Sequence, residues 1–131
     1  MEVTSHDERR LKLELRLAQL EKNETCQKQF LSFVKTIWPS FIQGRHHEII
    51  AEKLERVARG ELKRLIINMA PRHTKSEFAS FLFPAWMMGR NPNMKIIQAT
   101  HTTELAVNFG RKVKNLLDTE EFREVFPDVK L

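Results

Sequence analysis

A lysine and a serine, Lys75 and Ser76, stand where a short apolar run gives way to a long apolar-rich segment. The run at residues 65–69 predicts a strand and the later segment predicts a helix, with Pro71 at the bend between them. The first N–H groups of such a helix have no intrahelical acceptor and carry the positive end of its dipole, which suits phosphate. Lys75 would add a charge for the β- and γ-phosphates of a nucleotide, and the Ser76 hydroxyl would be a ligand for Mg²⁺.

The loop departs from the phosphate-loop pattern G-x-x-x-x-G-K-[ST] at both glycine positions. Met69 stands at the first position and Thr74 at the second. Glycine at the second position lets the backbone close on a phosphate without a Cβ, so we expect Thr74 to weaken this approach or to impose a different local conformation. An ordinary strand-to-helix turn with a basic cap is the alternative interpretation of the lysine and serine alone.

The composition is that of a mildly basic globular chain. Its 131 residues correspond to one domain or to a piece of a larger protein, and 41% hydrophobic residues can supply a core. The 22 lysines and arginines exceed the 17 acidic residues and give a net charge of +5. This charge suits an anionic partner such as nucleotide or nucleic acid, although a basic soluble domain needs no such partner.

Cysteine content and hydropathy bear on the compartment. Cys26 is the only cysteine, which excludes an internal disulfide and a thiolate metal cluster and fits a reducing environment. The first eight residues are acidic, unlike a signal peptide, and no window approaches the length of a transmembrane helix. We therefore expect a cytosolic protein without membrane contact.

Two strand-then-helix units set the expected fold class. We expect helices at residues 7–24, within 23–42, at 46–58, after Ser76, at 103–117 and at 120–125, and strands at 65–69 and 94–99. The two strands, joined by a helix, predict a parallel βαβ unit with a right-handed crossover. Ligands of such sheets lie beyond the carboxyl ends of the strands, which would place Thr100 and His101 on the same rim as the loop.

Proline, glycine and threonine residues mark the expected ends of the helices. Pro39 should end the second helix, and Gly60 should end the third. Pro84 should kink or shorten the helix that follows the loop. Thr100 or Thr102 should cap the helix at 103–117.

The helix at residues 7–24 contains leucines at helical spacing. Leu13, Leu17 and Leu20 fit one face, so the segment is either a docking or self-association helix or a helix that lies on the domain. We favour the second interpretation, because a short segment lacks the sustained heptads of a coiled coil.

Histidines and basic residues offer further candidate sites. His46 and His47 could bind a metal, but neighbours on a helix point apart and no third ligand lies at helical spacing, so a position near a nucleotide base is the better interpretation. Basic residues of the helix at 103–117 either face nucleic acid or form a solvated helix face. They are Arg111, Lys112 and Lys114.

Five blocks of sequence, in their order and spacing, resemble the amino-terminal ATPase region of the large terminase subunits of tailed phages. The blocks are residues 44–55, 59–61, 69–76, 83–86 and 99–106. Phe126 and Pro127 fit the same pattern, and the resemblance covers residues 30–131. It implies an α/β fold, namely part of a three-layer P-loop NTPase of the additional-strand type with parallel strands, preceded by N-terminal helices.

The resemblance also implies a function and a set of site residues. The family's motor uses ATP and Mg²⁺ to translocate double-stranded DNA into procapsids. Lys75 and Ser76 would hold phosphates and Mg²⁺, and Arg72 would stabilise the γ-phosphate, so Arg72 and Lys75 are the implied catalytic residues. The whole implied nucleotide site consists of Pro71, Arg72, His73, Thr74, Lys75 and Ser76 on the loop and of Gln43 and His46 beside the adenine.

The sequence departs from the family in ways that bear on activity. Thr74 replaces a glycine, and Arg45 replaces a tryptophan that is common there. Hydrolysis needs a strand that ends in an acidic pair, the Walker B strand, and neither this strand nor the family's nuclease domain follows. We therefore expect an N-terminal helical extension at 1–29 and part of an ATPase domain at 30–131, which is an active ATPase only if a missing C-terminal part completes it.

These implications define the expected partners and the competing functions. The expected partners are double-stranded DNA, the small terminase subunit, the portal and a second chain with the rest of the ATPase and the nuclease, all in the host cytoplasm. A non-catalytic module with a degenerate P-loop, which binds DNA or another motor subunit, is the alternative. A helicase-like ATPase fragment would share the chemistry, but the motifs at residues 71–73 and 83–86 do not support that interpretation.

Overall fold

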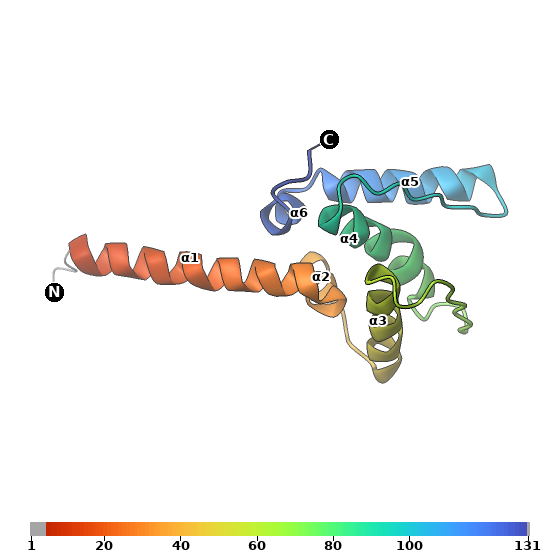
Figure 1. The fold of residues 1–131 in the computed structure, drawn as a ribbon, viewed down its shortest axis with the longest axis horizontal. Helices are drawn as coiled ribbons and strands as arrows, with labels where there is room; N and C mark the ends of the chain where they lie inside the picture. Colours follow the sequence, from red (N-terminus) through yellow and green to blue (C-terminus); the bar gives the residue numbers. More distant parts are fainter. Residues whose placement is uncertain (1–4, 131) are drawn as a thin grey trace.

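The computed structural model describes residues 5–130, and all regular secondary structure in that range is helical (Figure 1). In chain order the elements are α1 (Ser5–Lys28), α2 (Phe30–Ile37), α3 (Arg45–Ala58), the π-helix η1 (Glu77–Leu82), α4 (Phe83–Arg90), α5 (Thr103–Leu117) and α6 (Glu120–Val125). None of these helices combines the length and the apolar character needed to cross a membrane.

The predicted α/β fold with parallel strands is wrong. Neither residues 65–69 nor residues 94–99 form a strand, and residues 5–130 contain no sheet. A sheet requires neighbouring extended segments about 5 Å apart with a ladder of backbone hydrogen bonds. The second segment instead runs beside α4 and α5, where the Gln98 side chain donates to the Ser80 carbonyl oxygen (2.5 Å). Ile97 of this segment is 95% exposed, so the apolar run is only partly buried.

The hydrophobic core forms around the aromatic residues of α2. The Phe30 ring lies 5.5 Å from the Phe78 ring and 5.5 Å from the Trp86 ring, between centroids. Phe33, one turn later, packs on α6, with its ring 6.0 Å from that of Phe122. An apolar stripe of Phe30, Phe33 and Val34 follows the i, i+3, i+4 spacing of a helix face, which explains why so short a helix is well packed.

Only the C-terminal end of α1 belongs to this core. Asn23 Nδ2 donates to the Glu124 carbonyl oxygen (2.9 Å), and Trp86 Nε1 donates to the Cys26 carbonyl oxygen (2.9 Å). Residues 5–18 are exposed throughout, and Figure 1 shows this part of α1 projecting away from the other helices. The helix extends beyond the predicted 7–24 at both ends, and residues 1–4 of the predicted extension lie outside the described residues.

A single helical stretch follows the loop and changes its hydrogen-bonding pattern near Pro84. Residues 75–76 are α-helical, η1 follows, and α4 continues to Arg90 with Pro84 in its first turn. In an α-helical register the N–H of residue 84 would donate to the Ser80 carbonyl oxygen, but proline has no N–H, and the Gln98 amide donates to this oxygen. The helix is not shortened at Pro84, and the change that precedes this residue is a π-helical turn.

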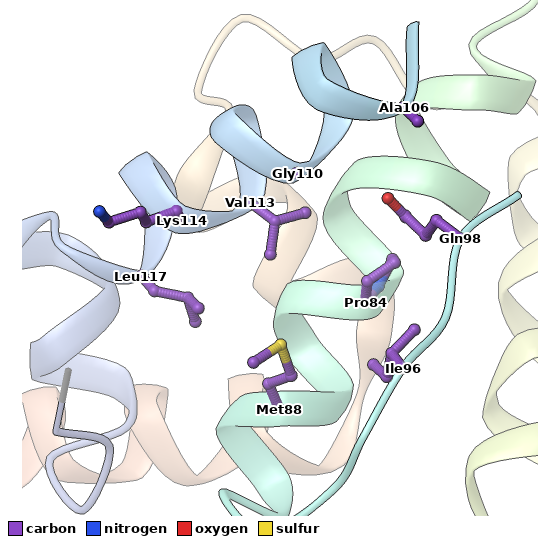
Figure 2. A pocket seen from close by; sticks show the side chains of 9 residues that line it. All are labelled: Pro84, Met88, Ile96, Gln98, Ala106, Gly110, Val113, Lys114 and Leu117. Atoms are coloured by element: carbon purple, nitrogen blue, oxygen red, sulfur yellow. The ribbon is translucent and has the colours of Figure 1, made fainter. Parts of the chain in front are cut away.

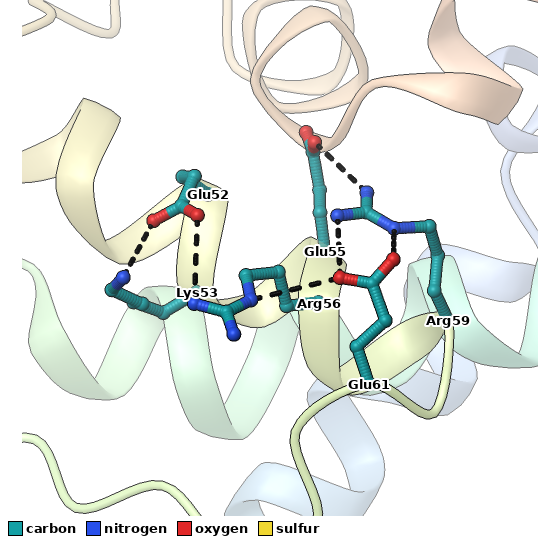
Figure 3. A network of polar contacts seen from close by, with 6 residues as sticks. All are labelled: Glu52, Lys53, Glu55, Arg56, Arg59 and Glu61. Atoms are coloured by element: carbon teal, nitrogen blue, oxygen red, sulfur yellow. Dashed lines mark hydrogen bonds and ion pairs between the residues drawn. The ribbon is translucent and has the colours of Figure 1, made fainter.

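A charged network stabilises the C-terminal end of α3. The helix ends at Gly60, which has a left-handed φ of +76°, as predicted. Figure 3 shows the ion pairs around this end, which join Glu52, Lys53, Glu55, Arg56, Arg59 and Glu61. Most of these side chains are solvent-exposed, so each pair contributes little. Glu55 does more, because its Oε1 accepts the Phe30 N–H (2.9 Å) at the start of α2.

An apolar hollow of about 400 Å³ lies between α4, α5 and residues 94–99. Figure 2 shows Ile96 and Gln98 on the irregular segment, opposite Val113 on α5. The hollow is lined by Pro84, Met88, Ile96, Gln98, Ala106, Gly110, Val113, Lys114 and Leu117. Because none of these residues belongs to the loop at 71–76, the hollow is separate from the predicted nucleotide site.

The last two helices agree with the sequence-based bounds. α5 and α6 begin and end at the predicted residues, and the Thr102 hydroxyl accepts the Leu105 N–H (3.3 Å) as N-cap. Thr119 caps α6 in the same way by accepting the Phe122 N–H (3.3 Å). The proposed boundary between residues 29 and 30 stays a prediction.

Candidate phosphate-binding site

The loop before η1 contains two residues in the left-handed backbone region. Arg72 has a φ of +64° and Thr74 a φ of +60°. A β-branched residue rarely adopts this conformation, and a residue held there costs about 1–3 kcal/mol. Thr74 thus takes up a backbone conformation that favours glycine, at the position where the phosphate-loop pattern has glycine.

A buried histidine on α3 holds Thr74 in place. His47 Nε2 lies 2.6 Å from Thr74 Oγ1, and Thr74 Oγ1 donates to the His73 carbonyl oxygen (2.6 Å). The Gly44 N–H donates to His47 Nδ1 (2.8 Å), so Nδ1 is the acceptor and Nε2 carries the proton in neutral His47. The chain of hydrogen bonds therefore runs from the start of α3 into the loop.

The electrostatics favour the neutral form of His47. Burial lowers the pKa of this imidazole below its ordinary value, and the neighbouring His46 lowers it further. A second proton would have to sit on Nδ1, where the Gly44 N–H already points. His47 is consequently a hydrogen-bond donor to the loop near neutral pH.

The helix after the loop begins at Lys75. The Phe78 N–H donates to the Thr74 carbonyl oxygen (3.0 Å), so the first turn starts directly after Thr74. The amides of Lys75, Ser76 and Glu77 belong to that turn and have no acceptor within the helix. Together with the half-buried Lys75 side chain, they form the positive end of a helix that runs on to residue 90.

An acidic side chain also lies in this first turn. Glu77 Oε1 is 3.0 Å from Lys112 Nζ on α5. This ion pair offsets the negative charge of Glu77, which would otherwise repel a phosphate at the start of the helix. Lys112 thus pairs with a carboxylate instead of lying on a free basic face. The other predicted loop residues are exposed: Pro71, Arg72, His73 and Ser76.

The structure places His46, one of the two predicted adenine-binding residues, beside the loop. The His46 ring lies 6.1 Å from the His73 ring, and the missing Cβ of Gly44 leaves room for it, since an added Cβ would be 2.9 Å from His46 Cε1. Gln43 Nε2 donates to Glu48 Oε1 (2.5 Å), whereas Gln43 Oε1 is buried without a hydrogen-bond partner. The structure thus brings His46 to the loop, whereas the hydrogen bond of Gln43 runs to Glu48 in the first turn of α3.

Two sequence-based expectations about this region need correction. The His46 and His47 rings do not point apart, since their centroids are 3.8 Å from each other. The expectation that Thr100 and His101 lie on the same rim as the loop depended on a parallel sheet, which residues 5–130 do not form.

His47 itself was not among the predicted site residues. Its position three residues after Gly44 is nevertheless one from which a side chain reaches the N-cap amide.

A magnesium site made of protein ligands alone is not present in the described residues, where no group of three His, Cys, Asp or Glu side chains could hold a metal. The predicted ligand, the Ser76 hydroxyl, lies on an exposed residue in the first helical turn. Mg²⁺ commonly keeps several waters and binds through one or two protein groups and substrate phosphates. The role of the Ser76 hydroxyl as a magnesium ligand stays a prediction.

Comparisons with models of known protein families, with curated proteins and with solved structures found no match to this chain. The family resemblance thus stands on the sequence blocks at residues 44–55, 59–61, 69–76, 83–86 and 99–106.

Proposed function

We propose that residues 71–76 bind the phosphates of ATP together with Mg²⁺, as part of a DNA-packaging motor of the terminase type. The main support for the proposal is the conformation of this loop. Two of its residues are in the left-handed backbone region, His47 contacts its Thr74, and the loop leads directly into a helix that begins at Lys75. These features bring backbone amides and a lysine to one place.

The charges of the loop support phosphate as the ligand. Lys75 supplies a point charge in the first turn, and the exposed Arg72 supplies a guanidinium that can contact a phosphate group with two N–H donors. A hydrogen bond to a charged group contributes about 1.5–3 kcal/mol. Loss of Lys75 should therefore weaken binding by roughly tenfold or more.

The residues at the start of α3 support a purine base beside the phosphates. Gln43 and His46 are the residues that the family resemblance places beside the adenine, and the His46 ring lies 6.1 Å from the ring of His73 on the loop. We therefore propose ATP as the nucleotide, with His46 near the base and Ser76 as the protein ligand of Mg²⁺.

The family resemblance supplies the rest of the proposal. In it, ATP binding serves the translocation of double-stranded DNA into procapsids in the host cytoplasm, with the small terminase subunit, the portal and a second chain as partners. In that family hydrolysis also needs an acidic residue at the end of the Walker B strand, and residues 5–130 form no strand. These residues by themselves should therefore bind nucleotide weakly and should not hydrolyse it.

A titration with a fluorescent ATP analogue tests this function. Anisotropy should rise with protein concentration in the presence of Mg²⁺ and much less with EDTA. Lys75→Ala should weaken binding about tenfold or more, whereas the control Lys35→Ala, on the exposed side of α2, should leave it unchanged.

Two results would contradict the proposal. Binding that is absent in every condition would favour the non-catalytic module, which contacts DNA or another motor subunit without nucleotide. Equal losses in Lys75→Ala and Lys35→Ala would show that general positive charge, and not the loop, attracts the nucleotide.

A further inference from the structure

We infer that the projecting part of α1 binds a second copy of this chain as a parallel pair of helices. Leu13, Leu17 and Leu20 are between 48% and 61% exposed, although leucine side chains normally gain free energy from burial. The domain contacts α1 through residues near its C-terminal end, such as Asn23 and Cys26, so the exposed leucines before them can lie against a second helix.

The three leucines occupy the seam positions of a heptad. With Leu17 at position a, Leu13 and Leu20 fall at the two flanking d positions, and leucine at d favours two-stranded coiled coils. At about 100° per residue, this face lies about a third of a turn from the side that Asn23 and Cys26 present to the domain. A second helix can thus lie along the seam without displacing the domain.

The charges beside the seam identify the occupant as another copy in parallel orientation. Before Asn23, the e positions are all acidic and both g positions are arginines, whereas the next e position is Lys28 at the end of α1. The acidic set is Asp7, Glu14 and Glu21, and the basic set is Arg9 and Arg16. In a parallel pair, a g residue faces the e residue five positions later in the partner, so each arginine would face a glutamate of the other copy.

An antiparallel pair is disfavoured by the same pattern. There, e positions face e positions and g positions face g positions, which would bring carboxylates together on one side and arginines on the other. Leu11 and Leu15 form a second exposed stripe on the opposite side of α1, but the seam between the oppositely charged flanks is that of Leu13, Leu17 and Leu20. A seam of three leucines is short, so the dimer should form and dissociate with concentration.

Sedimentation velocity of the full chain over a concentration series tests the pairing. We expect a shift from monomer to dimer as concentration rises. Leu13→Glu with Leu17→Glu should abolish the shift, whereas the matched control, Leu11→Glu with Leu15→Glu, should retain it because those leucines are equally exposed on the other side. Unfolding midpoints under monomeric conditions should be alike for both double variants, because all four sites lie outside the core.

Charge and orientation can be tested separately. Arg16→Glu should weaken the dimer at least tenfold, as should Glu21→Arg, and an equimolar mixture of the two variants should associate again. Leu13→Cys should form a disulfide-linked dimer under oxidation, because equivalent d positions face each other only in a parallel pair. A chain that stays monomeric at all concentrations, equal effects of both leucine pairs, or a dimer that Leu13→Cys does not crosslink would overturn the inference.

Discussion

His47 Nε2 lies 2.6 Å from Thr74 Oγ1, across 27 positions of sequence. This contact joins the first turn of α3 to the loop that precedes η1. It holds a β-branched residue at a φ of +60°, a conformation that threonine alone would avoid. The shape of the candidate phosphate site therefore depends on a histidine from another helix.

The hydroxyl of Thr74 should matter more than its methyl group. Thr74→Val keeps the side-chain shape but leaves the Nε2–H of the buried His47 without an acceptor, so we expect a loss of about 1–3 kcal/mol in the free energy of unfolding. Thr74→Ser keeps the hydroxyl and should change stability by no more than about 0.5 kcal/mol. Urea denaturation of both variants measures the difference, and equal stabilities would show that the hydrogen bond contributes nothing.

Glycine at position 74 should favour nucleotide binding. Thr74→Gly removes the Cβ next to the predicted phosphate and suits the left-handed φ, so affinity for Mg²⁺-ATP should stay the same or rise. Anisotropy with the fluorescent analogue measures this, with the stability of the variant checked in parallel because its contact with His47 is lost. A large fall in the affinity of the folded variant would contradict the assignment of the loop.

The lowered pKa of His47 predicts a loss of stability in mild acid. Because the folded pKa lies below the unfolded value of 6.5, the folded state binds fewer protons than the unfolded state in this range. The contribution of His47 to the free energy of unfolding is complete above pH 6.5. It is lost as the pH falls below that value and through the pKa of His47 in the folded state.

The variant His47→Gln has no imidazole that can be protonated in this pH range. The free energy of unfolding of this variant should therefore decline less than that of the original chain between pH 7.5 and pH 5.5. His101→Gln, which alters an exposed histidine, serves as the control and should keep the original decline. If the free energy of unfolding declined equally with pH in the original chain and in His47→Gln, His47 would not be the source of the decline.

Gln98 and Pro84 should be energetically coupled through the Ser80 carbonyl oxygen. Gln98→Ala removes the amide that donates to this oxygen and should cost about 1 kcal/mol of unfolding free energy. In a Pro84→Ala background the cost should be smaller, because the new backbone N–H can donate to the same oxygen. A double-mutant cycle by thermal or urea unfolding gives the coupling, and strictly additive effects would contradict it.

The sequence predicted helices well where local signals were strong. α5 and α6 have the predicted bounds because each starts at a threonine that accepts an amide of the first turn, Thr102 or Thr119. Gly60 likewise ends α3 through a local backbone conformation that glycine favours. Such signals act within a few residues and need no tertiary contact.

The predicted strands failed for a tertiary reason. The apolar runs at residues 65–69 and 94–99 have the composition of strands, but a strand exists only if a neighbour supplies its hydrogen bonds. The second run instead packs near α4, where Gln98 donates to the Ser80 carbonyl oxygen. Nothing in a short apolar run shows which of these partners a segment will have.

The candidate site was only partly predictable. The Lys75 and Ser76 pair marked a helix N-terminus correctly, because the helix does begin there. The contact of His47 with Thr74 joins residues 27 positions apart and could not be read from either local motif. The role of His47 depends on the tertiary packing of the start of α3 against the loop.

The most direct test of the account follows backbone amides by NMR while Mg²⁺-ATP is added. Binding by the loop predicts chemical-shift changes concentrated at the amides of Lys75, Ser76 and Glu77, with smaller ones near Gln43 and His46, and none of them in Lys75→Ala. Changes confined to basic residues of α5, or no changes at all in the loop amides, would contradict the claim that this helix N-terminus binds a nucleotide.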